Sequence, residues 1–289
     1  MTLLRNPRGH VREGWKALGF LAVMAALVTA VNLVFRHVLH VRHVGDMGNV
    51  LLSLALGLLA SWTCLRAEGL SLASIGFVPG RWWMRELGLG ALLGGGLMVV
   101  TALAALGARG FHWVRGAGTP ASTAWGFLLF LLVAFNEETI FRGYFFQQLA
   151  AGLGAWPTQI LLAALFALAH WGNPGMTGAT RIWASLNIGL AAILLGLCYL
   201  RTGSLALPIG VHLGWNFTQG NVLGFGVSGT TMAPGLLKPV FLGRPEWLTG
   251  GAFGLEASLP CALVCTACIV ALAWWRPRAL ESASPAATS

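Results

Sequence analysis

Two glutamates and two histidines stand inside apolar runs of this 289-residue chain, where ionisable side chains are rare. Glu137 and Glu138 interrupt one run, His170 and His212 lie in two later runs, and Asn216 follows His212 by four residues. An ionisable group at membrane depth is costly, so it is retained mainly where it has a partner or a task. Acid, base and amide groups in a low-dielectric cavity are the groups needed to activate water and to stabilise an oxyanion.

The spacing around the glutamates pairs one of them with a cation. Glu138 and Arg142 are four residues apart, which places them on one helix face in the favourable acid-first order. Glu137 is turned about 100° around the same helix and can face a different space. A buried salt-bridge network that only orients helices would show the same spacing, so the spacing by itself leaves both interpretations open.

The two histidines have helical neighbours that fit either a site or a core. His212 and Asn216 share one helix face, and Phe166 precedes His170 by one turn, where its ring can pack on the imidazole or line a groove. A single histidine on an apolar face is most often a hydrogen-bonded core residue. Two of them, in segments separate from the glutamate pair, converge less readily by chance.

The composition places these residues in a membrane protein. Only 9% of the residues are Asp, Glu, Lys or Arg, against about 25% in soluble domains, and the mean hydropathy is +0.74. The other seven of the nine acids lie outside the apolar runs, in loops or at segment ends, and need no special explanation. The net charge of +9 is not gathered into basic clusters, which argues against a nucleic-acid-binding protein.

Eight apolar segments approach the length of about 20 residues that crosses a bilayer. In chain order they are 17–35, 49–65, 87–106, 123–149, 157–171, 183–200, 205–216 and 259–275. The fifth and seventh are short and are expected to be buried against protein. The long connection 217–258 is rich in Gly and Pro, without obvious secondary structure, and such connections are often functional. The fold class expected is all-α, a polytopic membrane protein with about eight transmembrane helices.

Three motifs, in order, resemble those of the CAAX-protease and bacteriocin-processing family of intramembrane endopeptidases. Residues 137–142 read EETIFR and match EExxxR, residues 166–170 read FALAH and match FxxxH, and residues 212–216 read HLGWN and match HxxxN. The similarity is strong over about 127–216, weaker over 247–259 and only general over the first three segments. Each motif alone is weak evidence, but three in order are strong.

The resemblance implies a cavity in the membrane, open toward the cytoplasmic leaflet, and an activity like that of the type II CAAX prenyl proteases. Glu137 resembles the glutamate that activates water in this family, with assistance from His170. His212 and Asn216 resemble the pair that hydrogen-bonds the tetrahedral oxyanion. The supporting residues would be Glu138, Arg142 and Phe166.

Metal dependence is the open point of the expected mechanism. Glu137, His170 and His212 would supply three ligands of a catalytic zinc site, with water in the fourth position. The chain has no HExxH sequence, and the three ligands come from different segments. We therefore favour a metal-free reaction and expect no cofactor, with zinc as the alternative. Either version hydrolyses an amide with water and forms no covalent intermediate.

Other chemistries fit less well. Residues 226–229 read GVSG, like the GxSG of rhomboid-type serine proteases, but no histidine follows His212, so a turn at Ser228 is expected. An aspartyl protease needs two aspartates at membrane depth, whereas Asp46 is the only aspartate. The main alternative is a membrane transporter or a bacteriocin immunity protein without required proteolysis, although the repeated halves of many transporters are absent from the sequence.

We expect four parts along the chain. They are a cytoplasmic N-terminal segment 1–16, N-terminal transmembrane helices 17–120, a catalytic membrane domain 121–277 and a disordered tail 278–289. Lys and Arg are more numerous on the N-terminal side of the segments, which predicts a multi-pass protein of the cell membrane with its N-terminus in the cytoplasm. The expected partners are the lipid bilayer and a membrane-associated peptide or protein substrate, prenylated proteins included, with no nucleic acid.

Overall fold

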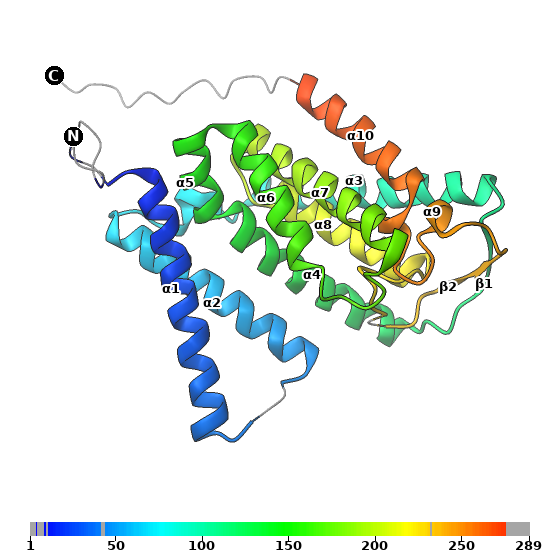
Figure 1. Ribbon diagram of the computed structural model, residues 1–289, viewed down its shortest axis with the longest axis horizontal. Helices are drawn as coiled ribbons and strands as arrows, with labels where there is room; N and C mark the ends of the chain where they lie inside the picture. Colours follow the sequence, from blue (N-terminus) through cyan, green and yellow to red (C-terminus); the bar gives the residue numbers. More distant parts are fainter. Residues whose placement is uncertain (1–3, 5–8, 10, 42–43, 232, 276–289) are drawn as a thin grey trace.

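The computed structural model describes residues 4, 9, 11–41, 44–231 and 233–275. These residues form an all-α fold with one small two-stranded sheet (Figure 1). The helices are α1 (Glu13–Leu33), α2 (Asp46–Ala67), α3 (Arg81–Gly107), α4 (Pro120–Arg142), α5 (Tyr144–Leu153), α6 (Ala155–Ala169), α7 (Gly178–Thr202), α8 (Ala206–Phe217), α9 (Glu246–Thr249) and α10 (Leu259–Trp274). The shorter helical turns are η1 (Val34–Val38), η2 (Leu72–Ile75), η3 (Thr218–Val222) and η4 (Leu255–Ala257), and the strands are β1 (Phe111–Arg115) and β2 (Leu237–Phe241). The expected tail 278–289 and most of 1–10 lie outside the described residues.

Each of the eight expected apolar segments contains a helix, and the all-α polytopic fold is confirmed. Within the described residues, five helical stretches are long and apolar enough to cross a membrane. They are α1 with η1, α2, α3, α4 with α5, and α7. Helices α6, α8 and α10 have 15, 12 and 16 residues and fall short of the length of about 20 that spans the hydrocarbon core. The expectation of short fifth and seventh segments is met, and the eighth is short as well.

The fourth expected segment is two helices rather than one. Helix α4 begins with Pro120 at its first turn and a capping box, in which the Thr119 hydroxyl accepts from the Ser122 amide at 3.2 Å and the Ser122 hydroxyl accepts from the Thr119 amide at 2.8 Å. The helix ends at Gly143, where a Cβ atom would overlap the carbonyl oxygen of Thr139. A residue without a side chain therefore lets the chain turn sharply between α4 and α5.

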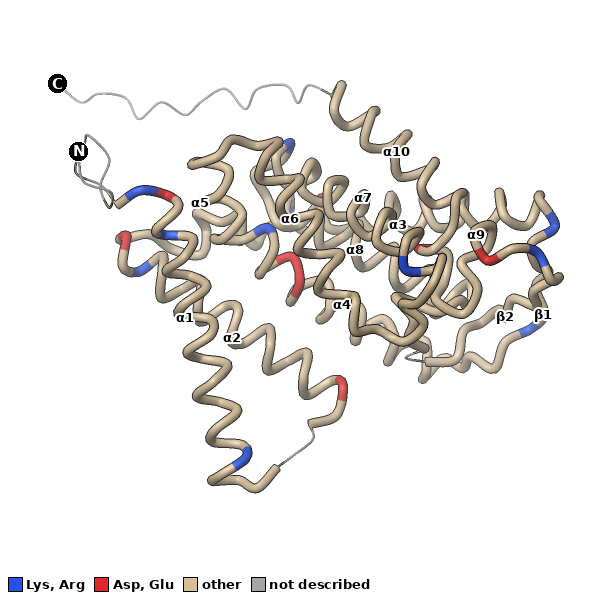
Figure 2. The backbone as a smooth tube through the Cα atoms, viewed as in Figure 1, with Lys and Arg blue, Asp and Glu red and all other residues tan. Residues whose placement is uncertain are grey.

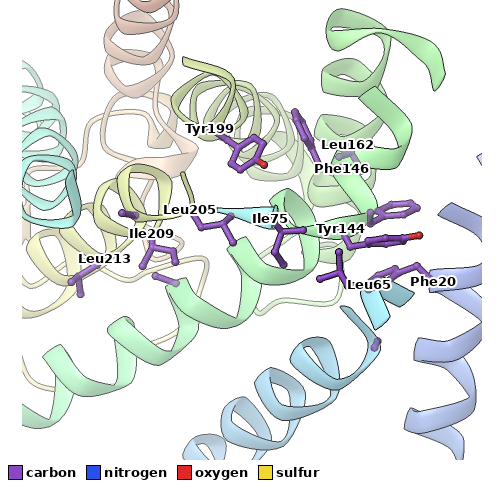
Figure 3. Packing of buried hydrophobic residues seen from close by; sticks show 14 of the residues in the cluster. Phe20, Leu65, Ile75, Tyr144, Phe146, Leu162, Tyr199, Leu205, Ile209 and Leu213 are labelled. Carbon is purple, nitrogen blue, oxygen red and sulfur yellow. The ribbon is translucent and has the colours of Figure 1, made fainter. Parts of the chain in front are cut away.

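The turn at Gly143 directs an aromatic cluster into the core. Tyr144, Phe145 and Phe146 are all buried at the start of α5. The ring of Phe20 from α1 lies 6.0 Å from that of Tyr144 and 5.8 Å from that of Phe145. Figure 3 shows Phe20 beside Tyr144. This contact attaches the otherwise exposed α1 to the helix bundle.

Glycines bring α3 and α8 into backbone contact. A Cβ atom added at Gly90 or Gly94 of α3 would overlap the backbone of α8, and one added at Gly210 or Gly214 of α8 would overlap that of α3. Small residues allow such close approach between membrane helices. Because the contact covers most of its length, the short helix α8 is fixed along α3.

The connection 217–258 is more ordered than expected. Strand β2 from this connection pairs antiparallel with β1, which follows α3, in a register that sets Phe111 opposite Phe241. The indole of Trp113 donates a hydrogen bond of 3.1 Å to the carbonyl of Leu223. The expectation of a connection without secondary structure is therefore wrong, because pairing with a distant strand supplies the backbone bonds that the local sequence does not indicate.

Most charged residues lie at the surface of the bundle, and a few are buried. In Figure 2 most Lys, Arg, Asp and Glu residues lie at helix ends and in connections, whereas acidic residues of α4 lie in the middle of the molecule. The interior of the fold therefore holds the acidic pair singled out from the sequence.

We predict that Gly214→Ala destabilises the protein, because its methyl group would overlap the backbone of Ala91 in α3. Overpacking of this kind costs about 1–3 kcal/mol. Thermal unfolding in detergent measures the effect, with Gly96→Ala as the matched control, since nothing lies within 4 Å of a Cβ at Gly96. Equal unfolding midpoints for the two variants would contradict the close packing of α3 and α8.

Candidate active site

A cavity of about 450 Å³ lies between α2, α4, α6, α7, α8 and the connection that follows α8. Its lining includes Glu137, Phe166, His170, His212 and Asn216. These five residues come from three helices that are far apart in sequence, and the structure brings them to one space. Their catalytic roles remain predictions.

Behind the cavity wall, Glu138 forms the expected pair with Arg142. Glu138 Oε1 accepts a hydrogen bond of 3.0 Å from Arg142 Nη1 and one of 2.9 Å from His212 Nδ1. Arg142 Nη2 donates to the carbonyl of Ala192 at 2.9 Å, and the guanidinium lies 5.1 Å above the ring of Phe166. Both charged side chains are almost fully buried. Glu138 thus connects α4 to α8, and Arg142 connects α4 to α7.

The two ring nitrogens of His212 lie near different glutamates. Its Nδ1 donates to Glu138, and its Nε2 lies 3.8 Å from Oε2 of Glu137. Glu137 keeps 24% of its side chain exposed, so it faces the cavity while Glu138 does not. The expectation that the two neighbouring glutamates face different spaces is confirmed.

His170 ends α6 with a defined ring orientation. Its Nδ1 lies 2.7 Å from the carbonyl oxygen of Phe166, and because a carbonyl only accepts, Nδ1 carries the hydrogen. A neutral ring then leaves Nε2 free to accept a proton. The rings of Phe166 and His170 pack edge to face at 4.8 Å, so the expected contact between them is confirmed.

Sequence analysis missed Glu256, which it grouped with the acids that need no explanation. Glu256 lies in η4, is 6% exposed and lines the same cavity. Its Oε2 accepts from the amide of Ser228 at 2.7 Å and from the hydroxyl of Ser228 at 2.9 Å, and its Oε1 accepts from the indole of Trp215 at 3.2 Å. The one available signal was its place in 247–259, where sequence analysis expected a weaker resemblance to the family.

Ser228 forms the turn that its Gly-rich surroundings predict. Ser228 and Gly229 have φ values of 48° and 80°, and Val227 and Thr230 exchange backbone hydrogen bonds of 2.8 and 2.9 Å around them. Two successive positive φ values are the mark of a tight hairpin turn. The hydroxyl of Ser228 lies in the cavity wall, but it donates to Glu256, and no histidine of the described residues is hydrogen-bonded to it. The geometry gives no support to a serine protease.

The described part of the chain contains no group of three or more His, Cys, Asp and Glu residues placed to hold a metal ion. The metal-free reaction and its zinc alternative, with Glu137, His170 and His212 as ligands, therefore both stay predictions. No step proposed below passes through a metal.

A family model described as type II CAAX prenyl endopeptidase, Rce1-like, matches residues 119–218. The matched segment begins at the residue before α4, ends just after α8 and contains all three motifs. The resemblance to the CAAX-protease family is confirmed over this segment. A search among curated proteins finds no match.

We predict that Arg142→Met strongly destabilises the fold, because it leaves the carboxylate of Glu138 buried without its cation. Removing one partner of a buried pair costs about 3–5 kcal/mol. The control is Arg85→Met, at an exposed arginine of α3, where a change within about 0.5 kcal/mol is expected. Unfolding in detergent measures both, and a similar loss in the two variants would refute a structural role for the pair.

We also predict a pH-dependent effect of Glu256→Gln on stability. Glu256 lies in the connection before α10, outside the membrane-spanning helices, and its burial raises its pKa against the opposing effect of the Ser228 hydrogen bonds. Because the pKa in the folded state is raised, the contribution of this group to stability is present at low pH and is lost as pH rises through the raised value. Glutamine does not titrate, so the unfolding midpoint of the variant relative to wild type should increase with pH. A difference that is constant with pH would contradict the raised pKa.

Proposed function

We propose that this chain is an intramembrane endopeptidase that hydrolyses a peptide bond near the membrane interface with a water molecule activated by Glu137. The observation that carries the proposal is the meeting of acid, base and amide side chains from α4, α6 and α8 in one cavity. The family match over 119–218 supports the same reaction class.

In this proposal, Glu137 and His170 activate the water molecule. The carboxylate of Glu137 is partly exposed to the cavity and takes a proton as the water oxygen bonds to the carbonyl carbon of the substrate. His170 presents Nε2 as a second proton acceptor, because its Nδ1 donates to the Phe166 carbonyl. The hydrogen bond to that carbonyl and the contact with the Phe166 ring keep the imidazole in this orientation.

In this proposal, His212 and Asn216 stabilise the oxyanion. The Nδ1 of His212 already donates to Glu138, so its Nε2 donates to an oxyanion only when the ring carries both hydrogens. Glu138 supplies the compensating negative charge, and Arg142 holds Glu138 in place. Preorganised donors of this kind are often the largest contribution to catalysis.

Collapse of the tetrahedral intermediate completes the reaction. The carbon–nitrogen bond breaks, and the proton taken from water passes to the leaving amine. The products are a new carboxyl terminus and a new amine, without an acyl-enzyme and without a metal-bound step.

The substrate in this proposal is a membrane-associated protein or peptide, and prenylated C-terminal segments are among its candidates. The cavity wall is largely apolar, with Phe130, Val133, Ile140, Ile188 and Leu194 around the polar groups, which suits an apolar substrate segment. We place the protein in the cell membrane with its N-terminus in the cytoplasm.

The test is cleavage of a fluorogenic prenylated peptide, or of a lysate-derived peptide pool, by protein purified in detergent. Glu137→Ala and His170→Ala should each lower the rate about 10²–10⁴-fold, the usual contribution of a general acid–base group. Glu246→Ala, at an exposed glutamate outside the cavity, is the matched control and should cleave like wild type. Wild-type activity in both site variants would disprove the mechanism.

Chelation tests metal dependence in the same assay. We expect the rate to be unchanged after strong chelation, because the proposed reaction uses no metal. Loss of activity that added zinc restores would overturn the metal-free mechanism.

A further inference from the structure

Glu256 is a second acid in the wall of the proposed active site, and the hydrolytic mechanism gives it no task. The residue comes from η4, forty residues after the last motif residue, Asn216, and outside the segment that matches the family model. Three hydrogen-bond donors converge on its carboxylate, two from Ser228 and one from Trp215. These donors belong to two separate paths through the structure.

One path leads to the water-activating side of the cavity. The carbonyl of His170 accepts from the amide of Asn173 at 3.0 Å, and the side-chain amide of Asn173 donates to the carbonyl of Ser228 at 2.9 Å. Ser228 in turn gives its amide and its hydroxyl to Glu256. Two residues, Asn173 and Ser228, thus connect the end of α6 to Glu256 through hydrogen bonds.

The other path leads to the oxyanion side. Trp215 donates its indole hydrogen to Glu256 and stands directly before Asn216 and three residues after His212 in α8. Helix α8 cannot shift along α3, because the glycine contacts between them fix its backbone. The hydrogen bond from Trp215 therefore holds Glu256 in position against a rigid helix.

The turn between the two paths is strained and needs these bonds. Ser228 has a φ of 48°, which is uncommon for a residue with a side chain and persists where the surroundings impose it. Glu256 and Asn173 hold its amide, its hydroxyl and its carbonyl. On the far side, the amide of Gly229 donates to the carbonyl of Phe253 at 2.9 Å.

Glu256 also interacts electrostatically with a residue of the site. Among the described residues, the titratable groups in electrostatic contact with it are His170, across the cavity, and the thiol of Cys261 in α10. Burial, the largest effect, raises the pKa of Glu256, and the interaction with His170 opposes it.

We propose that Glu256 is a positioning residue for the hydrolytic reaction, which holds the His170 side and the His212–Asn216 side of the cavity at a fixed separation through Ser228 and Trp215. The inference rests on the proposed endopeptidase function and extends it to a residue outside the three motifs. A space-filling role would not need a carboxylate with three donors aimed at it.

The primary test is Glu256→Gln in the cleavage assay. The amide nitrogen of glutamine cannot accept a hydrogen bond, so at least one donor of Ser228 or Trp215 loses its partner. We expect kcat to fall about 10–100-fold, the effect of small misplacements of catalytic groups, with KM changed less than about threefold. The matched control is Glu246→Gln, the same change at an exposed acid of the same connection, and it should leave both constants unchanged.

A second variant separates position from loss of folding. Trp215→Phe keeps an aromatic ring in α8 and removes only the indole donor, so kcat should fall less than in Glu256→Gln. If both act through the same contact, the double variant should be no slower than Glu256→Gln alone. Additive losses, or a kcat at the wild-type level in Glu256→Gln, would overturn the inference.

Amide hydrogen exchange provides a readout that does not depend on cleavage. Exchange over 225–230 should become faster in Glu256→Gln and stay unchanged in Glu246→Gln; equal rates in both variants would overturn the proposed link. A failure of the proposed function can be told apart from a failure of this inference. If the proposed function is wrong, Glu137→Ala does not reduce cleavage, whatever the exchange rates of the Glu256→Gln variant are.

Discussion

The carboxylate of Glu138 is the point on which the arrangement of the candidate site depends. It accepts hydrogen bonds from Arg142 and His212, and both of its partners are buried with it. Because a buried charge must keep its partners, these bonds set the distance between α4 and α8 and the orientation of the His212 ring. With that ring fixed, Glu137 is the glutamate left to face the cavity. The chemistry proposed for the site depends on this difference: Glu138 is held by Arg142 and His212, and Glu137 is exposed to the cavity.

The helices and this pair could be predicted from the sequence because both are local. Apolar runs indicated every long helix, and a spacing of four residues indicated the contact of Glu138 with Arg142. The meeting of His170 and His212 in one cavity could be inferred only through the family resemblance, since nothing in their spacing brings the end of α6 and α8 to the same cavity. The helix break at Gly143 was hidden in a continuous apolar run, because the signal for it is a backbone contact rather than polarity.

The features that sequence analysis missed share a dependence on contacts between distant segments. The pairing of β1 with β2 joins residues more than one hundred positions apart, and neither strand has a clear alternating pattern. Glu256 looked like a loop acid because its donors, Ser228 and Trp215, come from other parts of the chain. A charge count identifies acids inside apolar runs, but it cannot identify an acid that a folded connection buries.

Because α8 is short, the geometry of the candidate site does not depend directly on the thickness of the lipid bilayer. With 12 residues, nearly all of them buried, α8 does not span the hydrocarbon core and presents little surface to lipid. A thicker or thinner membrane acts first on long exposed helices, which tilt to match it. In this fold that adjustment falls first on α1, the least buried of the long helices, whereas the helix that carries His212 and Asn216 is fixed to α3 and moves only as part of the packed interior. The same site geometry can therefore be kept in membranes of different lipid composition.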